Sequence, residues 1–229
     1  MACGRGFDSR RLHHNMPRIV ALAGATGLVG REILQGLLAD TSVSAIHVLG
    51  RRALDAGIAK VTAHVVDFRA LPALPPVDEV FLALGTTIKV AGSRDAFRAV
   101  DVDANLAVAK AALAAGAKRA GLVSAMGASA KSGIFYNRVK GELEDALSAL
   151  PFEGLIIARP SLLAGNRESL GQPIRRGEGI ALSVSRLLGP LIPRNYRSIS
   201  AALVAKALLT RVPVARGREV VLSGQMRPD

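Results

Sequence analysis

The chain has 229 residues, half of them hydrophobic, which is enough for one well-packed domain and too short for two large ones. Aromatic residues make up only 3% and Trp is absent, so Ala, Val, Leu and Ile must build the core, and a wholly disordered chain is excluded. The net charge of +12 allows either a solvated, Arg-rich surface or a positive cleft for an anionic ligand. The sequence lacks the interleaved aromatic residues on which nucleic-acid bases stack, so it does not favour nucleic-acid binding.

The first residues are polar, and we expect a flexible tail over residues 1–17 before a single domain over residues 18–229. The tail contains three arginines but no apolar segment, which excludes a secretory signal. No run of about eighteen apolar residues occurs, so we expect no transmembrane segment. Cys3 is the only cysteine, which excludes an intrachain disulfide and fits a reducing compartment. These features together favour a cytoplasmic protein.

Strand and helix patterns alternate along the chain. Short apolar runs predict buried strands at residues 18–23, 45–49, 61–66, 79–84, 119–124 and 155–159, and a last strand at 219–222. Helical spacing predicts helices at residues 28–39, 94–115, 133–150 and 201–210. This alternation predicts an α/β fold with a Rossmann-type, doubly wound parallel sheet. The alternation of strands and helices ends after Pro160. Residues 161–200 are expected to form a small C-terminal cap on the substrate side.

A glycine-rich turn, residues 24–30, lies between the first predicted strand and the first predicted helix. Gly24 allows a tight turn, Gly27 lets the backbone approach a pyrophosphate, and Gly30 permits close packing of the helix on the strand. The helix N-terminus presents free N–H groups to phosphates. The alternative is a glycine-rich helix start that binds no ligand. The cofactor-binding residues predicted here are Gly24, Thr26, Gly27, Leu28, Val29 and Gly30.

The ends of three later strands add cofactor contacts. NAD-specific folds place an acidic residue after the second strand, but this chain has Arg51 and Arg52, which suit a 2′-phosphate. NADP(H) is therefore favoured over NAD(H), unless both arginines only face solvent. Asp67, after the third strand, either accepts a hydrogen bond from the adenine or caps a turn. The segment after the fourth strand is expected to line the adenosine side with Leu84, Gly85 and Thr86.

Three further residues predict proton-transfer chemistry. Tyr136 and Lys140 are four apart, so they share one face of a helix, and Ser124 ends the fifth predicted strand. Hydride transfer to a carbonyl needs a proton donor, and a nearby ammonium favours the phenolate form of a tyrosine. Ser124 is expected to hydrogen-bond the substrate oxygen, and Lys140 to hold the nicotinamide ribose as well. The alternative is a surface helix with accidental spacing.

These residues together resemble the short-chain dehydrogenase/reductase superfamily, and the glycine spacing resembles its extended or atypical branch. The segments that are similar to the Tat-interacting-protein-like oxidoreductases are residues 84–87, 91–97, 100–101, 124–128, 135–142 and 159–163. The resemblance implies a Rossmann fold, NADPH binding and catalytic roles for Ser124, Tyr136 and Lys140. It also implies that Pro160 borders the nicotinamide and that the long helices pair in a homodimer.

Other features leave alternatives open. In the cap, Arg167, Arg175 and Arg176 either meet an anionic substrate or lie on the surface, and residues 180–192 form either a buried lid or a membrane-associating patch. The histidines lack metal-ligand spacing, so we predict no metal site.

Three functions follow from these patterns. We expect an NADP(H)-dependent oxidoreductase that acts on a small, anionic or neutral, carbonyl or alcohol substrate. The second hypothesis is an NADPH-binding regulatory or sensor protein with little turnover. The third, a nucleic-acid binder, rests only on charge and is not favoured.

Overall fold

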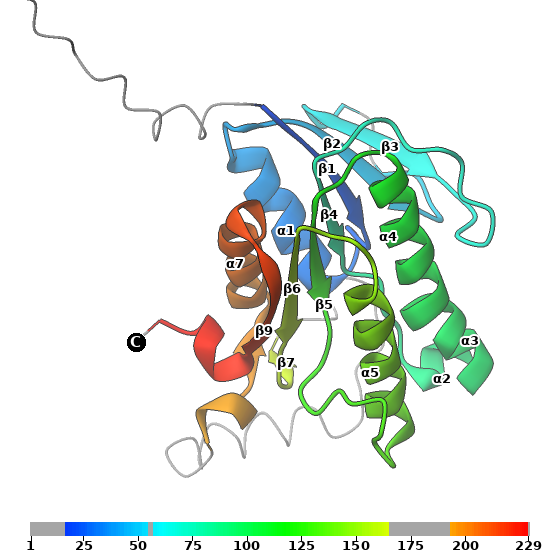
Figure 1. Cartoon of the computed structure of the whole chain (residues 1–229), viewed down its shortest axis with the longest axis vertical. Helices are drawn as coiled ribbons and strands as arrows, with labels where there is room; N and C mark the ends of the chain where they lie inside the picture. The colour runs from blue at the N-terminus through cyan, green and yellow to red at the C-terminus, as the bar shows by residue number, and fades with distance from the viewer. Residues whose placement is uncertain (1–16, 55–56, 165–192, 229) are drawn as a thin grey trace, which may run out of the picture.

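Seven strands form the central sheet, and the structure, a computed structural model, describes residues 17–54, 57–164 and 193–228. In chain order the strands are β1 (Arg18–Ala23), β2 (Val43–Gly50), β3 (Val61–Val65), β4 (Glu79–Leu82), β5 (Arg119–Val123), β6 (Gly154–Arg159) and β9 (Gly217–Leu222). Their spatial order is β3-β2-β1-β4-β5-β6-β9, and every neighbouring pair is parallel (Figure 1). The order therefore reverses between β1 and β4, where open α/β sheets bind ligands beyond the carboxyl ends of their strands.

Helices cover both faces of this sheet. The longer ones are α1 (Leu28–Ala39), α4 (Asn105–Ala114), α5 (Phe135–Ser148) and α7 (Ala201–Arg211). The shorter elements are α2 (Ile88–Ala91), α3 (Arg94–Arg98), the π-helix η2 (Ala99–Ala104), the 3-10 helices η5 (Arg194–Tyr196), η6 (Val212–Val214) and η7 (Ser223–Met226), and the strand pair β7 (Leu163–Ala164) and β8 (Ile199–Ser200).

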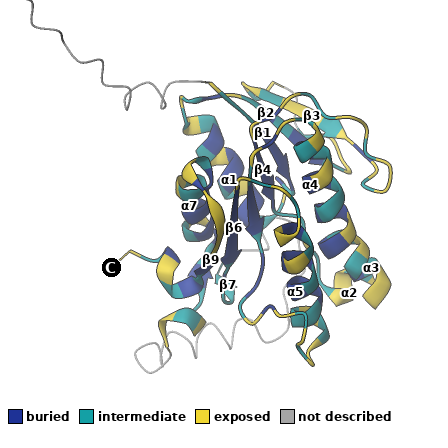
Figure 2. Cartoon of the chain, in the orientation of Figure 1, coloured by how far each residue is buried: buried dark blue, intermediate teal, exposed yellow. Residues whose placement is uncertain are grey.

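Two apolar clusters fill the space between the sheet and its helices. One joins α1 and α7 to the sheet and includes Ile33, Leu37 and Leu208. The other joins α4 and α5 to the opposite face and includes Val108 and Leu143. Figure 2 shows the buried residues concentrated on the strands and on the sheet-facing sides of the helices. The predicted doubly wound, Rossmann-type parallel sheet is confirmed.

Among the described residues, three differences from the predicted elements stand out. The expected helix over residues 94–115 is divided into α3, η2 and α4, because buried polar side chains at its centre bond to backbone groups. The short helix α2 occupies part of a predicted connection. Strand β3 is the sheet edge and leaves Val65 63% exposed, although the strands were expected to be buried on both faces. Residues 1–16, and residues 165–192 of the predicted cap, lie outside the described part of the chain.

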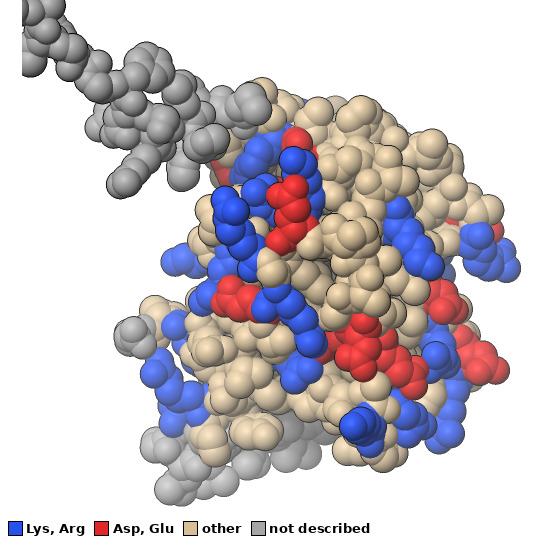
Figure 3. Space-filling view, in the orientation of Figure 1, with Lys and Arg blue, Asp and Glu red and all other residues tan. Residues whose placement is uncertain are grey.

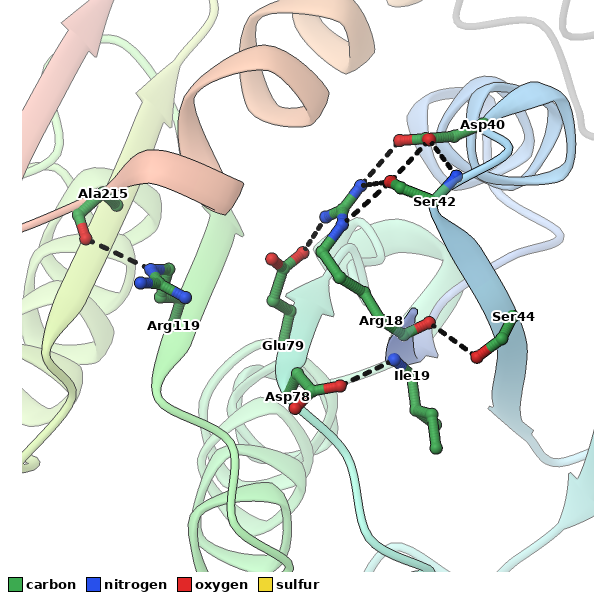
Figure 4. A network of polar contacts seen from close by, with 9 residues as sticks. All are labelled: Arg18, Ile19, Asp40, Ser42, Ser44, Asp78, Glu79, Arg119 and Ala215. Atoms are coloured by element: carbon green, nitrogen blue, oxygen red, sulfur yellow. Dashed lines mark hydrogen bonds and ion pairs between the residues drawn. The ribbon is translucent and has the colours of Figure 1, made fainter. Parts of the chain in front are cut away.

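A polar network ties the sheet together at its amino end, opposite the predicted cofactor site (Figure 4). The Arg18 guanidinium lies 2.6 Å from a carboxylate oxygen of Asp40 and 2.6 Å from one of Glu79, and its Nε donates to Ser42 at 3.2 Å. Glu79 is fully buried, and burial raises its pKa although Arg18 and Arg119 act in the opposite direction. Arg18 is therefore the counter-charge of a carboxylate that water cannot reach.

Two histidines meet at the β2–β3 edge. His47 Nδ1 lies 3.0 Å from His64 Nε2, so one ring must donate and the other accept. Burial, and then the charge that His64 carries when protonated, lower the pKa of His47. His64 thus has a structural contact, and within the described residues no three His, Cys, Asp or Glu side chains gather into a group that could hold a metal ion.

Charged side chains cover much of the visible surface. On the face drawn in Figure 3, Lys and Arg side chains alternate with acidic ones and do not merge into one continuous basic patch. No helix among the described residues combines the length and apolar character that crossing a membrane requires.

We predict that Arg18→Ala lowers the free energy of unfolding by about 3 kcal/mol, because it leaves the buried Glu79 carboxylate without its counter-charge. Urea unfolding at neutral pH measures this change. Arg211→Ala is the matched control, since Arg211 pairs with Glu219 on the surface and should cost less than about 1 kcal/mol. Equal losses in the two variants would contradict the assignment.

Candidate functional site

The turn after β1 adopts a conformation that only glycine fits. Gly24 has a φ of +91°, in the left-handed region. A Cβ placed on Gly24 would lie 2.4 Å from the carbonyl oxygen of Ala83 and 2.8 Å from the amide nitrogen of Leu84. The turn is therefore in direct backbone contact with the segment that follows β4.

The other two glycines of the motif bring α1 onto this turn. The Gly27 N–H donates to the Gly24 carbonyl at 3.0 Å, and a Cβ placed on Gly30 would lie 2.0 Å from the same oxygen. Gly27 is the N-cap of α1, and it provides no side-chain cap for the first amides of the helix. These N–H groups can bind an anion, and α1 has no acidic residue in its first turn to oppose one.

The remaining predicted residues of this turn differ in accessibility. Thr26 is exposed and Leu28 is half-buried, so both can contact a ligand at the surface of the turn. Val29 is buried in the core on the α1 side of the sheet. Its side chain packs against the fold, so a ligand contact from Val29 would come from its backbone.

The residues after β2 and β3 lie at the surface. Arg51 and Arg52 follow β2, are exposed, and pair with no acidic side chain among the described residues. Asp67 accepts hydrogen bonds from the Arg69 side chain and from its backbone N–H, at 3.0 Å for the latter. These hydrogen bonds hold the pKa of Asp67 below its ordinary value. Asp67 thus caps a turn in this structure, and its contact with adenine stays a prediction.

The segment after β4 is fixed by two side chains of the divided helix. Asn105 donates to the Leu84 carbonyl at 3.1 Å, and Asp101 accepts from the Thr86 N–H at 2.9 Å. Gly85, between them, is exposed. A Cβ placed on Gly85 would lie 3.6 Å from Asp101 Oδ1 and 3.9 Å from Lys140 Nζ. The structure therefore brings Lys140 next to the predicted cofactor-lining segment.

Lys140 and Asp101 form a buried ion pair. The distance from Lys140 Nζ to Asp101 Oδ1 is 2.7 Å, and the two side chains are 6% and 1% exposed. Burial works against the ammonium, but Asp101, with smaller contributions from Tyr136 and Glu144, outweighs it and raises the pKa of Lys140. Lys140 is a fixed positive charge at the carboxyl end of the sheet.

Tyr136 lies one turn before Lys140 on α5 and reaches the surface. It is 36% exposed, and its ring packs against Phe97 with 5.7 Å between ring centroids. Phe97 is fully buried and so anchors one side of the tyrosine ring. The structure thus places an accessible phenol on the helix that carries the buried ammonium.

The Ser124 hydroxyl hydrogen-bonds to Glu144 and not to Tyr136 or Lys140. It is buried directly after β5, and its hydroxyl donates to Glu144 of α5. Glu144 is also paired with Arg159, whose Nε lies 3.0 Å from Glu144 Oε1. The side chain of Ser124 is therefore engaged in this pair rather than directed to Tyr136, and its substrate contact stays a prediction.

Hydrogen bonds connect the segment after β6, Pro160 and Ser161, to other parts of the chain. Pro160 is buried, and its carbonyl accepts from the Met126 N–H at 2.9 Å. Ser161 donates to the Arg197 carbonyl and lies 3.0 Å from the Ser223 hydroxyl. Pro160 therefore stands at the carboxyl end of β6. The cap arginines Arg167, Arg175 and Arg176, and residues 180–192, lie outside the described residues.

Sequence reasoning missed two buried acids of this region, Asp101 and Glu144. Each pairs with a cation on another segment or strand, Asp101 with Lys140 and Glu144 with Arg159. For Asp101 the available signal was an acidic residue between two valines, Val100 and Val102. For Glu144 it was the position four residues after Lys140, on the same helix face.

Comparison with known proteins shows that the chain is similar to a group of fungal proteins. No family model matches the chain. The protein fmp52, mitochondrial, of Emericella nidulans is 41% identical over 180 residues, which cover 74% of this chain and 76% of that protein. FMP52, mitochondrial, of Eremothecium gossypii is 39% identical over 177 residues, or 76% of each chain.

Solved structures share the fold at lower identity. MoeE5 in complex with UDP-glucose and NAD is 18% identical with a TM-score of 0.65, covering 88% of this chain and 74% of that one. A short-chain dehydrogenase/reductase family oxidoreductase from Burkholderia thailandensis is 20% identical with a TM-score of 0.63, covering 93% and 94%. The enzyme WbmG of Bordetella bronchiseptica, in complex with NAD, is 17% identical with a TM-score of 0.62, covering 91% and 73%.

The names of the relatives correct one expectation. Relatives at about 40% identity are named mitochondrial proteins, so the expected cytoplasmic localisation is wrong. The observations behind it were the lone cysteine and the missing apolar signal segment. Neither observation distinguishes the cytoplasm from a mitochondrial compartment.

We predict that Gly30→Ala destabilises the protein by about 3 kcal/mol, because the added methyl group would overlap the Gly24 carbonyl. Thermal and urea unfolding measure the change. Gly133→Ala is the matched control, since a Cβ at Gly133 has no atom within 4 Å and should leave stability nearly unchanged. If Gly30→Ala were as stable as this control, the close approach of α1 and the turn would be refuted.

Proposed function

This chain belongs to the FMP52 family, and we propose that it is an NADP(H)-dependent oxidoreductase of the short-chain dehydrogenase/reductase type. The proposed reaction is hydride transfer between the nicotinamide and a small carbonyl or alcohol substrate. The motif resemblance to the Tat-interacting-protein-like oxidoreductases supports this assignment. The observation that carries it is the Tyr136–Lys140 pair, with the Lys140 ammonium next to Gly85 at the carboxyl end of β4.

The turn between β1 and α1 fits a dinucleotide. Gly24 and Gly30 let the turn, the helix and the segment after β4 pack backbone against backbone. Gly27, the N-cap of α1, presents no side chain to a pyrophosphate at the start of the helix. The first amides of α1 lack a side-chain cap and can bind its oxygens. Exposed Arg51 and Arg52 are placed after β2, where a 2′-phosphate would extend from the adenosine ribose. This arrangement supports NADP(H) over NAD(H).

The proton step follows from the side chains near Gly85. The bound cofactor supplies or accepts the hydride. Tyr136 is accessible at the surface and can donate a proton to the substrate oxygen as negative charge develops there. The Lys140 ammonium stabilises the phenolate that remains, because a nearby opposite charge favours the charged form. Ser124 would have to exchange its Glu144 partner to reach the substrate.

The contact between Ser124 and Glu144 also fits a second function. With the Ser124 hydroxyl bound to Glu144, the substrate oxygen loses one expected donor, and turnover would be low. An NADPH-binding regulatory or sensor protein fits this arrangement. Normal NADPH affinity without turnover on any carbonyl substrate would favour this function over the first. The homodimer and the anionic character of the substrate stay proposals.

We predict that Tyr136→Phe lowers the rate of NADPH oxidation with a carbonyl substrate by at least about a hundredfold, because the proton donor is removed. A panel of small aldehydes and ketones supplies the substrate. The NADPH affinity of the variant, measured by nicotinamide fluorescence, should equal that of the wild type. Equal turnover by the two proteins would remove Tyr136 from the reaction.

We predict that replacing Arg51 and Arg52 together by Ala weakens NADPH binding about tenfold or more, through loss of charge-assisted hydrogen bonds to the 2′-phosphate. NADH, which lacks this phosphate, serves as the internal control, and its affinity should stay nearly constant. An equal change for both cofactors would show that the arginines do not recognise the phosphate.

A further inference from the structure

The π-helix η2 directs a carboxylate into the proposed site. Asp101 lies on this six-residue π-helix and is fully buried, whereas Asp103, two residues later, is exposed. π-helical turns are rare and often occur at functional sites. Residues 99–104 therefore depart from regular α-helical hydrogen bonding at the point where the buried Asp101 carboxylate is positioned.

The Asp101 carboxylate joins two parts of the site. One oxygen lies 2.7 Å from Lys140 Nζ, and the other accepts from the Thr86 N–H at 2.9 Å. The backbone carbonyl of Asp101 is held in turn by Asn105, whose amide nitrogen lies 3.0 Å away. Both the side chain and the backbone of Asp101 are thus fixed by neighbours.

We propose that Asp101 is a positioning residue for the Tyr136–Lys140 pair: its carboxylate fixes the Lys140 ammonium beside Gly85 and ties it to the segment after β4. This inference rests on the proposed function and adds a residue to the same site. Breaking a buried ion pair costs far more than breaking a surface pair, because a charge is left without water or partner. Removing the carboxylate should therefore drive Lys140 to lose its proton more easily.

Among the described residues, the other charged groups near Lys140 do not position its ammonium. The charged and titratable groups on the elements around Lys140 are Arg94, Asp95 and Arg98 of α3, Asp101 and Asp103 of η2, Lys110 of α4, and Tyr136, Arg138, Glu142, Glu144 and Asp145 of α5. Glu144 is already paired with Arg159, and Glu142 with Arg98. Residues 84–86 contribute backbone N–H groups and no charge. Among the residues that the structure describes, Asp101 is the carboxylate in direct contact with the ammonium.

The test follows the titration of Lys140 by nuclear magnetic resonance in the full-length protein with isotope-labelled lysine and no cofactor. The Lys140 signal is identified by its absence in Lys140→Arg. In Asp101→Asn, the titration midpoint of Lys140 should fall by about two units, as expected for the loss of an opposite charge in direct contact. Asp103→Asn removes the same charge from the exposed position of the same π-helix and should leave the midpoint unchanged. Asp101→Glu should restore most of the shift.

Three results would overturn the proposal. These are an unchanged midpoint in Asp101→Asn, an equal fall in Asp103→Asn, or a Lys140 midpoint in the wild type below that of the exposed Lys110. The last measurement needs no variant and stands if Asp101→Asn fails to fold. Since no cofactor is present, failure of NADPH to bind would refute the proposed function and leave this result intact.

Discussion

The close backbone contact between the β1–α1 turn and the segment after β4 determines the geometry of the whole site. Gly24 and Gly30 allow this contact, since a Cβ at either position would overlap a carbonyl oxygen. The contact lies where the strand order reverses, between β1 and β4. Because α1 starts here without a side-chain cap, its first amides have no side-chain partner and are available to a ligand beside the segment after β4. The proposed cofactor site is thus a consequence of packing two backbones together.

The second part of the site depends on a buried ion pair that links distant parts of the chain. Lys140 comes from α5 and Asp101 from the π-helix, and Thr86 completes the contact from the segment after β4. The Lys140 ammonium is therefore held at the carboxyl end of the sheet, where the glycine turn also lies. Tyr136, anchored against Phe97, is one helical turn away and open to solvent. The proposed cofactor binding and proton transfer therefore share the carboxyl end of the sheet.

The sequence predicted the parts of this fold that depend on local pattern. β1 and α1 occur with the expected boundaries, because a short apolar run, a glycine turn and an amphipathic repeat follow one another directly. The π-helix could not be predicted, since it is stabilised by Asp101 and Asn105, whose partners lie far away in sequence. The Ser124–Glu144 contact escaped prediction for the same reason. A serine at a strand end carries no sign of which helix residue its hydroxyl will meet.

The central claim is that a dinucleotide binds against the first amides of α1. The most direct test is to titrate isotope-labelled protein with NADPH and to follow the backbone amide resonances. The account predicts saturable shifts that are largest at residues 24–30, with further shifts at residues 51–52 and 84–86. Binding that leaves residues 24–30 unperturbed, or no binding at millimolar NADPH, would contradict it.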